Sequence, residues 1–246
     1  MKKFRTIVFD LGGVLIDYSL ERSIEAFRRI GYGQIETLID PYRQSGVLLQ
    51  LEKGEVGPEA LYDEISRSVG RPVDPEAIDA ALCGFLLDIP DYKLDMLLDL
   101  RRRGFRLFML SNTNTIMMTY MKNGVFRKQG LTIDAYFDRL FLSYEMGLVK
   151  PGAEIFRRMI ESSGIVPSQT LFIDDSQANV DTGKNLRIRY LSGGPERRFP
   201  AVVRPHRAVG LMDGGKSALG KPKTANVDCP VGERSWIKDR YGRGIW

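Results

Sequence analysis

The fold of this chain is decided by the stretch Ile7-Val8-Phe9-Asp10-Leu11-Gly12-Gly13-Val14-Leu15, an apolar run that ends in one carboxylate and two glycines. Such a run is typical of a buried strand in a parallel sheet. A second apolar run also ends in acids, in Leu171-Phe172-Ile173-Asp174-Asp175-Ser176. Because the functional groups of open α/β sheets gather at the carboxyl ends of the strands, we expect Asp10, Asp174 and Asp175 to meet at one edge.

Three carboxylates at one edge repel one another, and a divalent cation that prefers oxygen ligands commonly stabilises such a cluster. The sequence therefore predicts a Mg²⁺ site that involves Asp10, Asp174 and Asp175. A simpler interpretation stays open at this point, in which Asp10 begins a turn and one of the other two acids caps a helix.

The composition is that of a soluble globular protein, with 246 residues of which 43% are hydrophobic. This length allows one large domain or a core with an insertion. No stretch approaches the roughly 18 continuous apolar residues of a membrane span, so no membrane partner is expected. The two cysteines, Cys83 and Cys229, lack the number and spacing of a disulfide framework or a zinc site, so a reducing cytoplasm is the expected compartment.

The positive charge of the chain is unevenly distributed. The net charge is +5, but residues 1–186 contain 23 Lys and Arg against 26 Asp and Glu, whereas residues 187–246 contain 13 against 5. The basic excess therefore belongs to the last part of the chain, and nucleic acid is not an expected partner of the rest.

A helical block is expected directly behind the first strand. Apolar residues at helical spacing mark the buried face of its first helix, which should end near Gly31: Leu20, Ile24, Phe27 and Ile30. Further helices are expected to begin at Pro58, and at Pro75 with Asp74 as its cap. Since residues 18–89 contain no convincing strand, they are predicted to form an all-helical cap inserted into the fold.

From Pro90 onward, helices and strands are expected to alternate as in a doubly wound sheet. Strands are predicted over residues 105–110, 140–142 and 171–173, and a helix from Pro151 to just before Gly164. The predicted fold class is therefore α/β, with a doubly wound, mostly parallel, Rossmann-like sheet formed by residues 1–17 and 90–191.

The end of the chain differs in character from the rest. Residues 188–191 could add one more strand, although Arg187 and Arg189 fit it awkwardly. Residues 192–246 are rich in Gly, Pro and Arg without sustained periodicity, so they are predicted to be an irregular or disordered basic tail.

Polar residues follow the other predicted strands as well. Ser111 and Asn112 come directly after the second strand, where a hydroxyl and backbone N–H groups would suit a phosphoryl oxygen. Lys150 precedes Pro151 and could place a positive charge beside a phosphate and the Asp10 carboxylate. Taken singly, Ser111 and Asn112 are more typical of turns and caps than of a phosphate site, and a lone lysine such as Lys150 is more typical of an exposed surface.

The order of these motifs resembles the phosphatase branch of the haloacid dehalogenase superfamily with a helical cap, over about residues 4–190. Within it, the chain is similar to the subgroup that contains bacterial α-D-glucose-1-phosphate phosphatase. Four motifs carry the resemblance: Asp10-Leu11-Gly12-Gly13-Val14, Ser111-Asn112-Thr113-Asn114, Lys150-Pro151 and Asp174-Asp175-Ser176-Gln177-Ala178-Asn179.

The resemblance implies a role for each matching residue. Asp10 would be the nucleophile and a metal ligand, Lys150 the charge stabiliser, and Ser111 and Asn112 the phosphate binders. Asp175 and the Gly12 carbonyl would bind Mg²⁺. Asp174 would bind it through water or support the residues that do, and Asn179 would orient the acids. The implied activity is hydrolysis of a small phosphorylated metabolite through an aspartyl-phosphate.

One position departs from the pattern, because most phosphatases of this superfamily carry a second aspartate where this chain has Gly12. A missing general acid can lower the rate about 10²- to 10⁴-fold. Asp17 is a candidate substitute, although its position favours the start of a cap helix. Two other functions therefore stay open, namely a metal-independent haloacid dehalogenase and a non-catalytic protein that binds a phosphorylated metabolite.

The substrate itself is not predicted beyond this class. It should be selected by polar residues of the cap near the entrance, for which the candidates are Tyr18, Arg22, Arg43 and Glu52.

Overall fold

A computed structural model describes residues 4–40, 44–192, 237–238 and 244–245 of the chain. Residues 1–206 and 207–246 form two separate units. Most of the predicted tail lies outside the described residues. Apart from Ser192, the described residues of the tail form two short antiparallel strands, β6 (Ile237–Lys238) and β7 (Gly244–Ile245).

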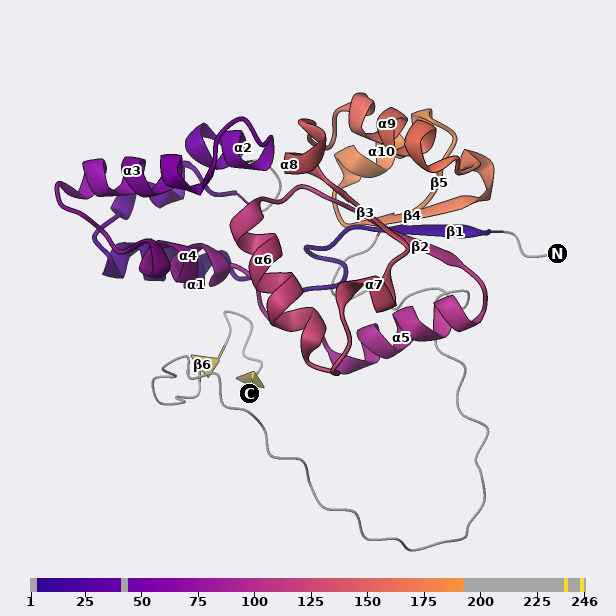
Figure 1. Cartoon of the computed structure of the whole chain (residues 1–246), viewed down its shortest axis with the longest axis horizontal. Coiled ribbons are helices and arrows are strands. Elements are labelled where there is room, and N and C mark those ends of the chain that lie inside the picture. Colours follow the sequence, from indigo (N-terminus) through magenta and orange to yellow (C-terminus); the bar gives the residue numbers. More distant parts are fainter. Residues whose placement is uncertain (1–3, 41–43, 193–236, 239–243, 246) are drawn as a thin grey trace, which may run out of the picture. The chain divides into compact units, whose positions relative to one another are not determined.

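The first unit is built on a five-stranded sheet in the order β3-β2-β1-β4-β5, in which every neighbouring pair is parallel (Figure 1). Its strands are β1 (Thr6–Phe9), β2 (Arg106–Ser111), β3 (Arg139–Leu142), β4 (Thr170–Asp174) and β5 (Arg189–Ser192). The predicted doubly wound α/β class is confirmed. The chain changes direction across the sheet between β1 and β4, and ligands bind at such a switch point in open α/β folds.

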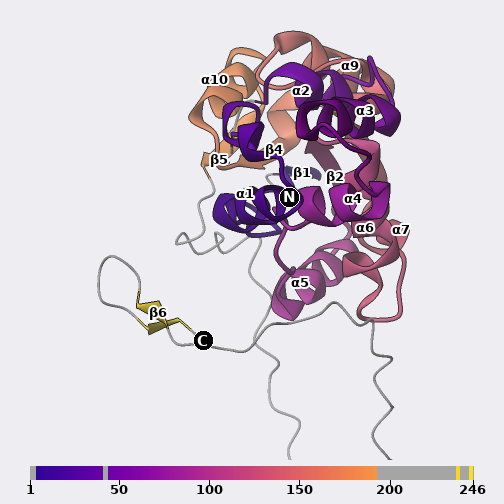
Figure 2. The same ribbon diagram turned by 90° about the vertical axis from the view of Figure 1, so that its left-hand side faces the viewer.

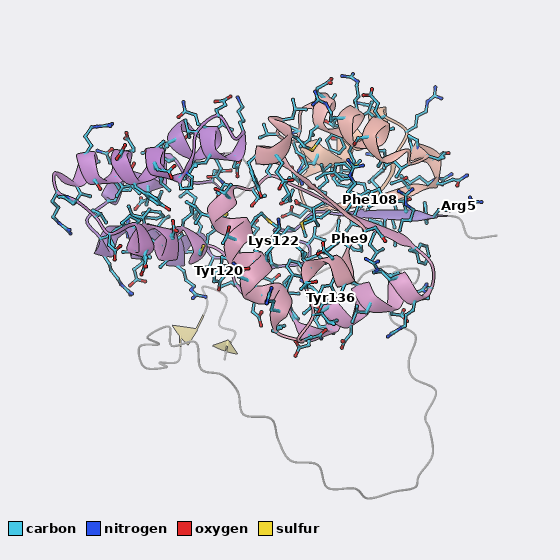
Figure 3. The ribbon with its side chains drawn as sticks, in the orientation of Figure 1. Arg5, Phe9, Phe108, Tyr120, Lys122 and Tyr136 are labelled. Carbon is cyan, nitrogen blue, oxygen red and sulfur yellow. The ribbon has the colours of Figure 1, made fainter. Side chains whose placement is uncertain are left out.

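Alternate residues of the strands point to two helical layers. Ile7 and Phe9 pack on one side, and Val8 and Phe108 on the other. Figure 3 shows Phe9 and Tyr136 on the same side of the sheet and Phe108 on the opposite side. Full burial of one such phenylalanine stabilises the fold by roughly 1.5–3 kcal/mol, so the central strands are held firmly from both faces.

The helices of each layer follow the strands in the chain. The first layer contains α5 (Asp91–Arg102), α6 (Thr115–Asn123) and α7 (Ile133–Tyr136). The second contains α9 (Ala153–Ser163) and α10 (Gln177–Asn185), and the short helix α8 (Ser143–Met146) directly follows β3.

A block of helices lies at the carboxyl ends of the strands (Figure 1). In Figure 2 the molecule is turned so that this block faces the viewer. It contains α1 (Leu20–Arg29), the 3₁₀ helix η1 (Gly33–Thr37), α2 (Gly46–Glu52), α3 (Pro58–Val69) and α4 (Pro75–Cys83). Helices α3 and α4 begin at the predicted prolines, and the Asp74 carboxylate accepts a hydrogen bond from Glu76 N (3.1 Å) as a cap. That residues 18–89 act as a separate cap stays a prediction.

The two segments that join this block to the sheet run side by side. Ser19 N donates to Phe85 O (2.8 Å), and Leu87 N donates to Asp17 O (2.9 Å). The Tyr18 and Phe85 rings stack with centroids 5.1 Å apart. The helical block is therefore held to the sheet by two paired segments rather than by one.

Several predicted boundaries differ from the structure. The strand predicted over 105–110 lies one residue later, which places Ser111 at the end of β2. The helix expected to begin at Pro151 begins at Ala153, because a turn in which Gly152 N donates to Val149 O (3.0 Å) comes first. Strand β5 does form. Arg187, two residues before the strand, lies outside it with a left-handed backbone φ of 62°.

No helix within the described part of the chain combines the length and the apolar character that a membrane crossing requires.

Candidate active site

A pocket lies where the helical block meets the carboxyl ends of β1, β2 and β4. Most of the predicted site residues line it, namely Asp10, Gly12, Ser111, Asn112, Lys150, Asp175 and Asn179. The helical block and the segments that join it to the sheet add a wall of mixed polarity: Tyr18, Ile39, Gln44, Leu48, Glu52, Leu82, Phe85 and Leu86. The structure thus brings together residues from four distant parts of the chain.

The Lys150 ammonium joins two of the acids. Its Nζ lies 2.9 Å from Asp10 Oδ1 and 2.7 Å from Asp174 Oδ2, and its side chain is almost fully buried. The charges of these two carboxylates raise the pKa of Lys150 to about 12 although burial alone would lower it. Lys150 is therefore a fixed positive charge at any working pH.

Asp174 is the buried anchor of this arrangement. It is fully buried, and its carboxylate accepts hydrogen bonds from Ser176 N (2.9 Å) and Asn179 Nδ2 (2.9 Å) in addition to the bond from Lys150. Because both of its oxygens already have donors, Asp174 is suited to hold Lys150 and Asn179 in place.

Asp10 uses one of its oxygens for internal contacts. Oδ1 accepts from Leu11 N (2.7 Å) and pairs with Lys150, whereas no hydrogen bond or ion pair from the described residues reaches Oδ2. One carboxylate oxygen is thus fixed and the other is free to meet a ligand in the pocket.

The three acids form the kind of cluster that a divalent cation would fit. Asp10, Asp174 and Asp175 each offer an oxygen within 4.8 Å of the others. Burial is the largest influence on Asp10 and Asp175, and it raises both pKa values, that of Asp175 to about 6, with the Asp174 charge adding to the effect. Since an oxygen-only donor set is typical of Mg²⁺ sites, the residues present fit this ion.

Gly13 is required by the approach of Asp175. A Cβ atom at position 13 would lie 2.1 Å from Asp175 Oδ2, and the backbone there has φ +69°. At position 12, by contrast, the nearest atom to a Cβ would be Tyr18 Cδ1 at 3.8 Å. The close approach of Asp175 therefore requires a glycine at position 13 and not at position 12.

Gly13→Ala is expected to displace the Asp175 carboxylate and to weaken Mg²⁺ binding by about tenfold or more, as losses around metal ligands typically do. Isothermal titration with MgCl₂ measures this. Gly164→Ala is the matched control, because Gly164 has a similar φ of +63° with open space around it and should show the backbone strain alone. Equal Mg²⁺ affinity in the two variants would contradict this account.

Asn112 holds Lys150 rather than pointing its amide at a ligand. Its Oδ1 accepts from Lys150 N (2.8 Å), and its Nδ2 donates to Lys150 O (3.0 Å). The side chain is thus committed to the main chain of Lys150, and any phosphate contact from this residue would come from its backbone. Among the residues that the structure describes, the Ser111 hydroxyl donates a single hydrogen bond, to Asn112 O (3.3 Å), and its oxygen stays available to a ligand.

The predicted entrance residues lie in different places. Tyr18 and Glu52 line the pocket, whereas Arg22 is exposed and is not part of its lining. Arg43 lies outside the described residues. Asp17, the candidate substitute acid, pairs with Lys93 of α5 at 3.6 Å and does not line the pocket, so its position supports a structural role.

The family comparison agrees with this geometry. A family model described as haloacid dehalogenase-like hydrolase matches residues 4–187. A D-ribitol-5-phosphate phosphatase from Bacteroides thetaiotaomicron is 36% identical over 182 residues, which cover 74% of this chain and 88% of that protein. A phosphorylated carbohydrates phosphatase from Thermotoga maritima is 24% identical over 219 residues, or 88% of this chain and 94% of that protein.

A solved structure of a haloacid dehalogenase family enzyme has a similar fold. A haloacid dehalogenase family enzyme from Bacteroides thetaiotaomicron in complex with magnesium and inorganic phosphate superposes with a TM-score of 0.76 at 38% identity, covering 82% of this chain and 100% of that one. The chain therefore belongs to the haloacid dehalogenase-like hydrolases, in the phosphatase branch of that superfamily.

Proposed function

We propose that this chain is a Mg²⁺-dependent phosphatase that hydrolyses a small phosphorylated metabolite, with sugar and polyol phosphates as the substrate class. The observation that carries the proposal is the Lys150 ammonium between Asp10 and Asp174, beside Asp175 in one pocket. The substrate class rests on the two relatives that act on ribitol 5-phosphate and on phosphorylated carbohydrates.

Asp10 is the proposed nucleophile. Its free oxygen attacks phosphorus, an Asp10 O–P bond forms, and the P–O bond to the alcohol breaks; water then hydrolyses the aspartyl-phosphate. Lys150 offsets the repulsion between the anionic nucleophile and the anionic phosphate, and Ser111 with nearby backbone N–H groups binds the phosphoryl oxygens.

Asp10, Asp175 and the Gly12 carbonyl would hold Mg²⁺, which would supply further positive charge next to the phosphate. Asp174 would support the site from behind, and Asn179 would orient it through its bond to Asp174.

The pocket volume is in keeping with a small substrate. The cavity measures about 90 Å³. The cavity therefore has room for several ordered water molecules, since one water needs a cavity of at least ~10–15 Å³. We propose that the core of residues 1–17 and 90–191 carries the chemistry and that the cap of residues 18–89 selects the substrate.

The low cysteine content supports a reducing cytoplasm as the compartment of the protein.

The two other candidate functions are less well supported. A metal-independent dehalogenase has no use for adjacent acids beside a carboxylate substrate, and the two relatives described above are both phosphatases. A protein that only binds a phosphorylated metabolite would share the pocket, and turnover separates it from the phosphatase.

Removal of divalent cations is expected to abolish phosphate release, because the repulsion among the three acids and the phosphate would then be offset by Lys150 alone. The purified protein is assayed with p-nitrophenyl phosphate and with a panel of sugar and polyol phosphates, first in EDTA and then with MgCl₂ in excess. Restored activity with Mg²⁺ supports the proposal. Full turnover in EDTA argues for a metal-independent enzyme, and binding without turnover for a binding protein.

A further inference from the structure

We propose that Glu52, on helix α2 of the helical block, transfers the protons of the reaction in place of the missing carboxyl at position 12. Protonated Glu52 gives its proton to the ester oxygen while the P–O bond breaks and the Asp10 O–P bond forms. The resulting Glu52 carboxylate then takes a proton from the water that attacks phosphorus, which breaks the Asp10 O–P bond and releases phosphate. This inference rests on the proposed phosphatase function.

The position of Glu52 in the pocket is the first argument. Glu52 lines the same cavity as Asp10, Gly12 and Lys150, although it lies about forty residues from the first and about a hundred from the last. It shares its helix face with Leu48, one turn earlier, which also lines the cavity. The same pocket is therefore lined by a carboxyl of the helical block and by the acids at the strand ends.

The lack of a partner is the second argument. Glu52 is only 8% exposed. Within the part of the chain that the structure describes, its carboxyl forms no ion pair and accepts no hydrogen bond. Among the described residues, no side-chain oxygen is both fully buried and without a hydrogen-bond partner, so the Glu52 oxygens are open to the pocket that the residue lines. A protonated carboxyl that meets a substrate oxygen would satisfy this group.

The end of α2 is also fixed against the segment that carries Lys150. Gly54 has φ +65°, and a Cβ there would lie 2.1 Å from the main-chain oxygen of Tyr144. Tyr144 belongs to α8, which leads within a few residues to Lys150. Glu52 and Lys150 are therefore positioned by the same stretch of core backbone, which gives the precision that proton transfer needs.

The surroundings of Glu52 also suit a proton donor near neutral pH. Burial raises its pKa to about 7, and the Lys150 charge acts in the opposite direction. Titratable groups on the elements around it are Asp10, Lys150 and Asp175 in the pocket, Lys53 and Glu55 beside it, Tyr144 and Glu145 on α8, and Glu59, Tyr62, Asp63, Glu64 and Arg67 on α3. Of these, Lys150 is the one whose charge opposes the effect of burial.

Glu52→Gln tests the proposal with two kinds of leaving group. The alkoxide of a polyol phosphate needs a proton when it leaves, so kcat for the best substrate among ribitol 5-phosphate, glycerol 3-phosphate and glucose 6-phosphate is expected to fall about 10²- to 10⁴-fold. p-Nitrophenolate leaves without a proton. With p-nitrophenyl phosphate and Mg²⁺, the variant should therefore release one nitrophenolate per active site in a burst and then turn over slowly, because no base activates the water.

The burst also counts folded, Mg²⁺-loaded sites, so loss of folding is separated from loss of proton transfer. Glu55→Gln is the matched control, since Glu55 is exposed, pairs with Lys53 at 3.4 Å and does not line the pocket; it should behave as the wild type. In the wild type, kcat/KM for the polyol phosphate should fall tenfold per pH unit above the pKa of Glu52, and this fall should be absent in Glu52→Gln.

A Glu52→Gln variant that keeps wild-type kcat for the polyol phosphate overturns the proposal. So does an equal loss with both substrates and no burst, which would show that Glu52 binds substrate or supports the fold. Failure of the phosphatase function itself is a different result, in which the wild type and Glu55→Gln release no phosphate from any substrate with Mg²⁺.

Discussion

Asp10→Asn is expected to lower kcat by on the order of 10⁴-fold or more while the fold is retained. The substitution keeps the size of the side chain but removes the anionic oxygen that attacks phosphorus, and loss of a covalent nucleophile has effects of about this size or larger. Lys150 keeps an ion-pair partner in this variant, because its Nζ also lies 2.7 Å from Asp174 Oδ2. Removal of one buried charge from an acid cluster should leave thermal stability equal or slightly higher.

Phosphate release with p-nitrophenyl phosphate and Mg²⁺ measures this effect. The phosphoenzyme is measured separately: acid quench of the wild type during turnover should trap an acyl-phosphate that hydroxylamine cleaves, and the variant should form none. Asp181→Asn is the matched control, because Asp181 is an exposed aspartate that pairs with Lys184 on α10. Activity that survives in Asp10→Asn would remove the aspartyl-phosphate step from the proposal.

The sheet could be predicted from the sequence because its strands are buried on both faces. Such strands consist of continuous apolar runs, and the runs before Asp10 and Asp174 are unambiguous. Their positions in a doubly wound fold then bring the two acids together. The last predicted strand was less clear, because Arg189 lies on β5 at the edge of the sheet, where an exposed charged residue is tolerated.

The parts of the site that could not be predicted depend on contacts between distant segments. That Gly13, not Gly12, makes room for Asp175 follows from a distance across the pocket. That Asn112 is bound to the Lys150 main chain follows from the register of β2 against a turn 38 residues later. No local pattern of residues contains either fact.

Helix α2 was missed for a related reason. It has only seven residues, begins at a glycine and has just Leu48 and Leu51 as buried apolar residues, so its periodicity is too short to detect. Glu52 at its end was predicted only as an entrance residue. Its burial and its place in the pocket lining become visible only when the helical block is placed over the sheet.

Lys150→Met should have the largest effect on stability of the variants considered. The substitution removes the cation that two buried carboxylates share, and loss of one partner of a buried ion pair typically costs about 3–5 kcal/mol. For a folded unit of this size the melting temperature should fall by about 6–20 °C. Phosphatase activity should fall as well, by about 10²- to 10³-fold, because the charge next to the developing phosphoryl transition state is lost.

The response of this variant to Mg²⁺ separates an electrostatic cause from lost packing. The Lys150 ammonium also lies 5.9 Å from the Phe172 ring, and methionine preserves much of that apolar contact. If repulsion between Asp10 and Asp174 is the cause, bound Mg²⁺ should restore more stability to Lys150→Met than it adds to the wild type. Thermal melting in EDTA and in MgCl₂ measures both shifts, and Lys184→Met, which removes an exposed lysine, should change neither. Equal Mg²⁺ shifts in Lys150→Met and the wild type would show that Lys150 and the metal do not offset the same carboxylates, and that Lys150 acts chiefly by packing.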